Sequence, residues 1–112
     1  MPGISAGGEA PSPRDAKAAI IPCEGTIDQA LFYSIQRRTE IALKDGAEYL
    51  IYQIGTYGGM VDAADSIAKY LIQDVAARGH TVAYVATEAI SAGALVSVSC
   101  QDIIMRENTT IG

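Results

Sequence analysis

The chain is 112 residues long, which is the length of one small domain. Hydrophobic residues make up 49% and charged residues 19% of it, so a buried core is possible, and no apolar run is long enough to cross a membrane. The formal net charge of −5 argues against general nucleic-acid binding, which requires a basic surface. Two cysteines and one histidine make neither a disulfide scaffold nor a zinc site, so we expect no metal and no cofactor.

The first 17 residues are rich in Gly, Pro, Ala and Ser, and this composition predicts a disordered leader. Residues 18–112 form the predicted domain. The start of the chain lacks the charged-then-apolar order of a signal peptide, so we expect the chain by itself to be soluble.

Short apolar runs alternate with segments of helical spacing along the rest of the chain. The predicted strands cover residues 18–23, 49–54, 81–86 and 103–105. The predicted helices cover residues 29–44, 60–78 and 89–100, and residues 108–112 are predicted to form a turn. The run at 49–54 lacks clean alternation, which suits a parallel strand that is covered on both faces. Strands alternating with helices predict an α/β fold with right-handed crossovers.

Local signals refine these helices. Thr26 or Asp28 is the expected N-cap of the first helix. The second helix carries an apolar stripe. The stripe consists of Val61, Ala64, Ile67, Ala68, Leu71, Ile72 and Val75. After that helix, His80 is expected to lie in a surface loop.

Two unusual turns follow the carboxyl ends of predicted strands. Gly58 and Gly59 follow the second strand, and Ser91 follows the third within a stretch of small residues at 89–94. Ligands of α/β sheets bind beyond the carboxyl ends of the strands. The two turns are therefore expected at one functional edge of the sheet.

Ser91 has two interpretations. A serine at a strand-to-helix turn is where acyl-transfer enzymes place a nucleophile. The N–H groups of Gly59 and Ala92 would then cradle the oxyanion, with Gly58 shaping the turn. The simpler alternative is a helix N-cap, which requires no chemistry. The diglycine is equally compatible with a plain turn or a phosphate cradle, but no Walker lysine follows it.

Five segments follow one another in a fixed order: Gly-Thr-Tyr-Gly-Gly-Met-Val at 55–61, Thr-Val-Ala-Tyr-Val at 81–85, Ala-Ile-Ser-Ala-Gly-Ala at 89–94, Ile-Ile-Met at 103–105 and Asn-Thr-Thr-Ile-Gly at 108–112. In this order they resemble the Clp protease/crotonase superfamily, and within it most the NfeD-type membrane-bound serine proteases. The resemblance covers residues 18–112, and the combination of segments is more specific than any one of them.

The resemblance implies a layered fold of repeated strand–strand–helix units that is incomplete at the C-terminus of this chain. It assigns Ser91 as the nucleophile and the N–H groups of Gly59 and Ala92 as the oxyanion donors, with Gly58 supporting the turn. It also implies a Ser-Lys dyad that cleaves apolar segments of membrane-associated proteins. We accordingly expect a peptide substrate, a homo-oligomer, no nucleic-acid partner, and membrane contact only through segments absent from this chain.

The chain departs from the family pattern in two respects. The family usually has Asp-x-Pro-Gly-Gly, where this chain has Gly55 and Tyr57 in place of the Asp and Pro, so the turn is less rigid and Tyr57 is expected to crowd the cleft. No Lys or His follows Ser91, so this serine would stay a weak nucleophile.

We therefore interpret the chain as part of a longer protein that is inactive by itself. The alternatives are a crotonase-type acyl-CoA enzyme, which uses a backbone oxyanion hole without a serine nucleophile, and a non-catalytic interaction module on the same fold.

Overall fold

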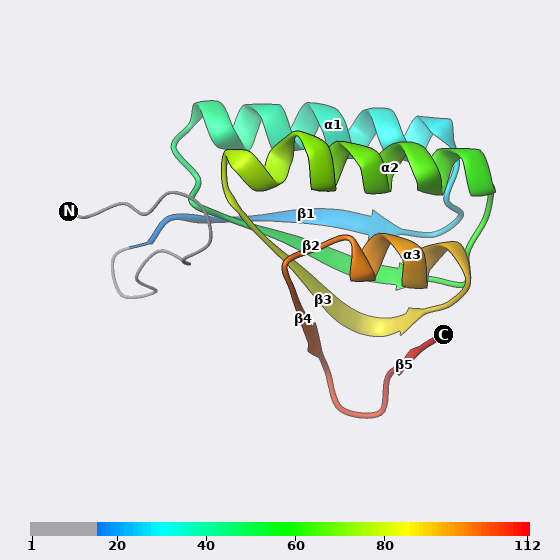
Figure 1. Ribbon diagram of the computed structural model, residues 1–112. Helices are drawn as coiled ribbons and strands as arrows, with labels where there is room; N and C mark the ends of the chain where they lie inside the picture. The colour runs from blue at the N-terminus through cyan, green and yellow to red at the C-terminus, as the bar shows by residue number, and fades with distance from the viewer. Residues whose placement is uncertain (1–15) are drawn as a thin grey trace.

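Within residues 16–112, five strands build one sheet, in which every pairing is parallel. A computed structural model describes residues 16–112, so residues 1–15 of the predicted leader lie outside the described residues. The strands are β1 (Ala18–Glu24), β2 (Tyr49–Thr56), β3 (His80–Ala89), β4 (Asp102–Met105) and β5 (Thr110–Ile111). The strand order is β1-β2-β3-β4, and β5 pairs with the end of β3 (Figure 1).

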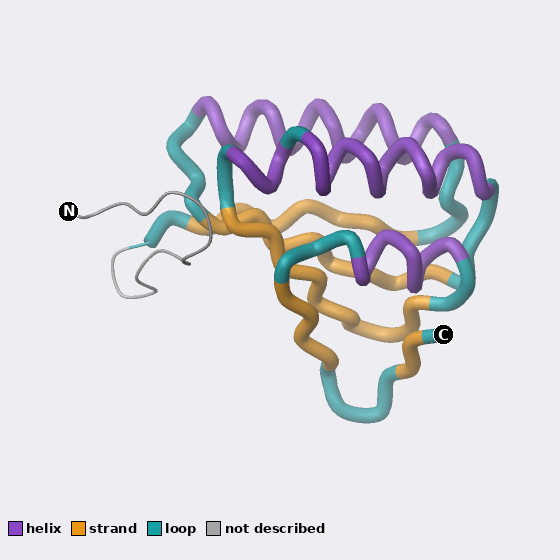
Figure 2. The backbone as a smooth tube through the Cα atoms, in the orientation of Figure 1, coloured by secondary structure: helices purple, strands orange, loops and turns teal. Residues whose placement is uncertain are grey.

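The helices of the described residues lie on one side of this sheet (Figures 1 and 2). They are α1 (Gln29–Lys44), α2 (Val61–Gln73), the short 3-10 helix η1 (Val75–Ala77) and α3 (Ala92–Val98). α1 and α2 lie side by side, and α3 packs against α2, β2 and β3. The parallel sheet with connecting helices confirms the predicted α/β class.

The core lies between the sheet and the helices. Along β2, Leu50, Tyr52 and Ile54 have no exposed surface, whereas the residues between them are partly exposed. The expectation that this strand is covered on both faces holds fully for one face only, because the other is partly exposed. Its burial alternates because the helices among residues 16–112 pack on one face.

The first helix has its predicted bounds, from residue 29 to residue 44. Asp28, one of the two expected caps, begins it, because its Oδ1 accepts the N–H of Leu31 at 2.9 Å. The hydroxyl of Thr39 on the buried side of the helix pairs with the hydroxyl of Tyr52 at 2.9 Å. This buried hydrogen bond ties α1 to β2.

The second helix is shorter than the predicted span of 60–78. α2 ends at Gln73, because Asp74 has a φ of −118° that departs from helical geometry and leads into η1. Val61 and Ile72, both predicted in the apolar stripe, are 77% and 58% exposed. The other stripe residues are buried as predicted.

The segments around the third strand also differ from prediction. β3 continues to Ala89 past the predicted end at residue 86, and α3 begins correspondingly later and is shorter. Thr110 and Ile111, predicted to lie in a turn, pair in parallel with Glu88 and Ala89. This pairing joins segments far apart in sequence, so no local pattern indicates it.

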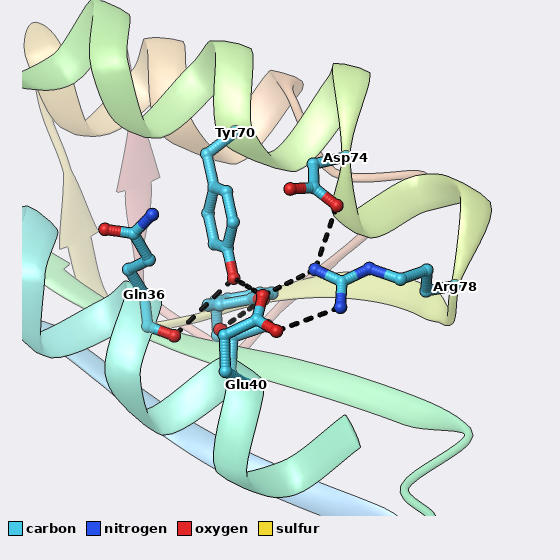
Figure 3. Close-up of polar contacts among 7 residues, drawn as sticks. Gln36, Glu40, Tyr70, Asp74 and Arg78 are labelled. Atoms are coloured by element: carbon cyan, nitrogen blue, oxygen red, sulfur yellow. Dashed lines mark hydrogen bonds and ion pairs between the residues drawn. The ribbon is translucent and has the colours of Figure 1, made fainter. Parts of the chain in front are cut away.

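Glu40 on α1 is held by residues of the α2–η1 segment (Figure 3). The Tyr70 hydroxyl donates to Glu40 Oε2 at 2.5 Å, and Arg78 donates from Nη1 to Oε1 at 2.9 Å and from Nη2 to Oε2. Arg78 also pairs with Asp74 at 2.9 Å. The hydrogen bonds from Arg78 and Tyr70 lower the pKa of Glu40 from its ordinary value of 4.5 to about 2.

This lowered pKa predicts a pH dependence of stability. The stability that Glu40 contributes is fully present above pH 4.5 and is lost as the pH falls from 4.5 towards 2, because the unfolded chain binds the proton more readily. As the pH falls from 4.5 towards 2, the midpoint temperature of thermal unfolding should therefore decrease more steeply for the wild type than for Glu40→Gln. The exposed Glu107→Gln should behave like the wild type. Identical pH profiles for the wild type and Glu40→Gln would contradict the prediction.

Candidate active site

Two chain turns meet at the carboxyl edge of the sheet. One follows β2 and contains Gly58 and Gly59, and the other follows β3 and contains Ser91. The N–H of Ile90 donates to the carbonyl of Thr56 at 3.0 Å. A side chain at Gly58 would place its Cβ 3.2 Å from the Cβ of Ser91 and 3.2 Å from the carbonyl oxygen of Ile90. The structure thus brings the two turns singled out by the sequence into contact.

An irregularity in the sheet precedes this contact. Ile54 pairs with Val85, but Thr56 pairs with Ala89, so β3 has two more residues than β2 between these pairs (89 − 85 = 4 against 56 − 54 = 2). Bulges of this kind bend a strand and redirect the side chains that follow. The shift accounts for the greater length of β3.

Ser91 adopts a backbone conformation that favours glycine. Its φ is 56° and its ψ is −115°, and the N–H of Gly93 donates to the carbonyl of Ile90 at 2.9 Å. These values describe the first central position of a type II′ turn. A non-glycine residue held there costs about 1–3 kcal/mol and persists only where the surroundings enforce it.

The Ser91 hydroxyl is free. Ser91 occupies the N-cap position of α3, but its side chain makes no capping hydrogen bond, and the residue is exposed. No other hydrogen bond of its Oγ occurs among residues 16–112. Ser91 therefore lies at the N-cap position, as the simpler alternative expects, but its hydroxyl does not cap the helix.

The diglycine turn is held against the loop before α1. Gly58 has a φ of 116°, which favours glycine, and its carbonyl accepts the N–H of Ile27 at 3.0 Å. A side chain at Gly59 would overlap the backbone of Ile27. Within residues 16–112, the N–H groups of Gly59 and Ala92 donate to no acceptor. Neither group is thus used by another backbone acceptor of the described residues.

The residues after β4 border the other side of Ser91. Its N–H donates to the carbonyl of Gly112 at 2.6 Å, and the N–H of Gly112 donates to the carbonyl of Ala89 at 3.0 Å. β5 pairs with the end of β3, and Gly112, the residue after it, bonds the backbone on both sides of Ile90. Sequence reasoning missed this strand.

The histidine of the chain is not near this site. His80 begins β3 rather than lying in the predicted loop, and its side chain is only 10% exposed, with Nε2 paired to the carboxylate of Asp102. The ring of Tyr49 packs edge-on against it at 5.6 Å. Because β3 is 10 residues long, His80 lies about 30 Å along the strand from Ser91. It is therefore not in reach as a base.

The lysines also lie away from Ser91. Lys17 precedes β1 and Lys44 ends α1, which places both at the edge where the strands begin. Lys69 on α2 pairs with Asp65 at 2.9 Å. Among residues 16–112, no hydrogen bond or ion pair joins a lysine or histidine to Ser91.

Gly55 and Tyr57, which replace the Asp and Pro of the family pattern, lie in different surroundings. A side chain at Gly55 would place its Cβ 2.9 Å from the hydroxyl of Thr87, so an Asp at this position requires Thr87 to move. Tyr57 is 77% exposed, and most of its surface faces solvent beside the diglycine.

The cysteines do not contribute a reactive group. Cys23 and Cys100 are buried and free, and burial raises the pKa of each thiol to about 12. No group of three or more His, Cys, Asp or Glu side chains in the described range is arranged to hold a metal ion. No helix between residues 16 and 112 has the length and apolar character needed to cross a membrane.

The fold and the two turns define a ClpP-like α/β domain, and comparison with known proteins narrows the class. ClpP1 from Listeria monocytogenes superimposes with a TM-score of 0.65 at 18% identity, over 72% of this chain and 46% of that chain, which shows a shared fold. The family model described as NfeD1b, N-terminal domain, matches residues 17–112. The chain belongs to this family.

Other relatives agree with this assignment. The membrane protein NfeD1b of Bacillus subtilis is 29% identical over 93 residues, which are 83% of this chain and 21% of that protein. The 1510-N membrane protease specific for a stomatin homolog from Pyrococcus horikoshii superimposes with a TM-score of 0.78 at 27% identity. That match covers 88% of this chain and 49% of the protease. The chain thus spans about a fifth of the curated relative and about half of the solved protease.

The strained backbone of Ser91 predicts an unusual order of stability. Ser91→Gly should be more stable than Ser91→Ala by about 1 kcal/mol, because only glycine occupies this turn position without strain. At Ser66, inside α2, the order should reverse, with Gly less stable than Ala by about 0.5–1 kcal/mol. Urea unfolding of the four variants measures both differences. If Ser91→Gly is less stable than Ser91→Ala, the backbone of Ser91 is not strained and the prediction is wrong.

Proposed function

We propose that residues 18–112 form part of a serine endopeptidase domain, with Ser91 as the nucleophile and the N–H groups of Gly59 and Ala92 as the oxyanion donors. The observation that supports this most is a free, exposed hydroxyl on a strained turn in contact with Gly58. Strained residues of this kind cluster at active sites. The unused N–H groups of both turns supply the complementary donors.

In this reaction Oγ of Ser91 bonds to the scissile carbonyl carbon, and the carbonyl oxygen takes the negative charge. The N–H groups of Gly59 and Ala92 stabilise that charge. Losing one such donor typically lowers the rate about 10²–10³-fold. The hydroxyl proton needs a base, and no Lys or His follows Ser91 in this chain. In the proteases that the chain resembles, this base is a lysine that follows the serine. Because residues 92–112 contain neither lysine nor histidine, we propose that another part of the whole protein supplies the base. The chain by itself should therefore not hydrolyse peptides efficiently.

We propose apolar peptide segments as the substrate. One related structure, at 27% identity, is a lysine-to-alanine variant of the stomatin-specific protease in complex with a substrate peptide. In this chain, Tyr57, Met60 and Val61 lie beside the diglycine and are 77%, 52% and 77% exposed. Such a cluster suits apolar side chains of a bound peptide.

Assembly and location are further proposals. The exposed apolar residues of β4, Ile103 to Met105, suit an interface within a homo-oligomer. The curated relative is called a membrane protein. We propose that the whole protein reaches a membrane through segments other than those described here.

A fluorophosphonate probe tests the nucleophile. Without a base, the hydroxyl of Ser91 stays a weak nucleophile that only hydroxide from the solvent can deprotonate. Labelling should therefore be slow, confined to Ser91, and faster as the pH rises. Ser91→Ala should abolish it. Ser99→Ala, which removes a hydroxyl bonded to the carbonyl of Leu95 in the same helix region, should not.

Equal labelling of the wild type and Ser91→Ala would refute the nucleophile. Micromolar binding of coenzyme A thioesters by an unlabelled protein would point to a crotonase-type enzyme. Absence of both reactions would indicate an interaction module on the same fold.

A further inference from the structure

Thr56, the last residue of β2, is a residue that the sequence did not single out. It is 1% exposed. Its hydroxyl donates to the carbonyl of Gly25 at 2.5 Å and accepts the N–H of Gly58 at 2.9 Å, and the carbonyl of Gly58 lies 3.3 Å away. One side chain thus connects the loop after β1 to the first glycine of the candidate oxyanion turn.

The same residue also contacts the turn that carries Ser91. The carbonyl of Thr56 accepts the N–H of Ile90 at 3.0 Å. A side chain on Gly93, in the first turn of α3, would place its Cβ 2.5 Å from Cγ2 of Thr56. The methyl group of Thr56 therefore packs directly against the start of α3.

The hydroxyl and the methyl group of Thr56 contact different turns. Valine keeps the shape of threonine but leaves the Gly58 N–H and the Gly25 carbonyl without their partner, which is costly at a buried position. Serine keeps the hydroxyl and loses only the methyl contact with Gly93. β-Branched residues also suit a strand. Threonine is the residue that satisfies both turns at once.

We propose that Thr56 is a positioning residue that holds the Gly58–Gly59 turn in register with the Ser91 turn. Its effect on reactivity rests on the function proposed above, in which Gly59 donates to the oxyanion. Its effect on the geometry of the turns does not, because it follows from the hydrogen bonds of Thr56.

The experiment compares Thr56→Val with Thr56→Ser and uses Thr81→Val as the matched control. Thr81 is also a fully buried strand threonine, and its hydroxyl accepts the N–H of Gln101 away from the candidate site. Amide hydrogen exchange of Gly58 and fluorophosphonate labelling of Ser91 are measured on all three variants. Thr56→Val should raise the hydrogen-exchange rate of the Gly58 amide about tenfold, because this amide loses its acceptor. It should lower the rate of Ser91 labelling by about the same factor, because the diglycine turn is no longer tied to Gly25. Thr56→Ser and Thr81→Val should stay within about threefold of the wild type in both.

Unchanged exchange at Gly58 in Thr56→Val would overturn the positioning role, as would an equal effect of Thr81→Val. Should Thr56→Val not fold, exchange in the wild type decides: the Gly58 N–H must be protected like a strand amide, and an unprotected one contradicts the proposal. A wild type that is never labelled refutes the proposed nucleophile, while hydrogen exchange still decides the role of Thr56.

Discussion

The close approach of two turns at the carboxyl edge of a parallel sheet is the constraint on which the structure depends. It is possible only because Gly58 has no side chain, since a Cβ there would lie 3.2 Å from both the Ser91 Cβ and the Ile90 carbonyl oxygen. The positive φ of Gly58 adds a second reason for glycine at this position. A side chain at position 59 would clash with the backbone of Ile27.

The surrounding elements hold Ser91 in a conformation that it would not adopt alone. On one side, the N–H of Ser91 donates to the carbonyl of Gly112. On the other side, Thr56 connects the diglycine turn to the start of α3. Strain persists where neighbouring contacts over-determine a residue. The core of α1, α2 and the sheet supports these contacts. The Ser91 side chain is exposed, and its hydroxyl makes no hydrogen bond within residues 16–112.

Periodicity and turn chemistry predict most of the fold. The helix at 29–44, the strand positions and the α/β class follow from local patterns. The break after Gln73, the extension of β3 and the pairing of β5 do not, because they depend on register and on contacts between distant segments. For the same reason, sequence placed Gly58 and Ser91 at one edge but gave no indication of Thr56, whose hydroxyl joins residues 25, 56 and 58.

The most direct test of the central claim is a crystal structure of the chain after reaction with a phosphonate probe. We predict a covalent bond from phosphorus to Oγ of Ser91, with one phosphonyl oxygen about 2.7–3.1 Å from the backbone nitrogens of both Gly59 and Ala92. An adduct on another residue, or a phosphonyl oxygen that faces solvent away from both nitrogens, would contradict the account.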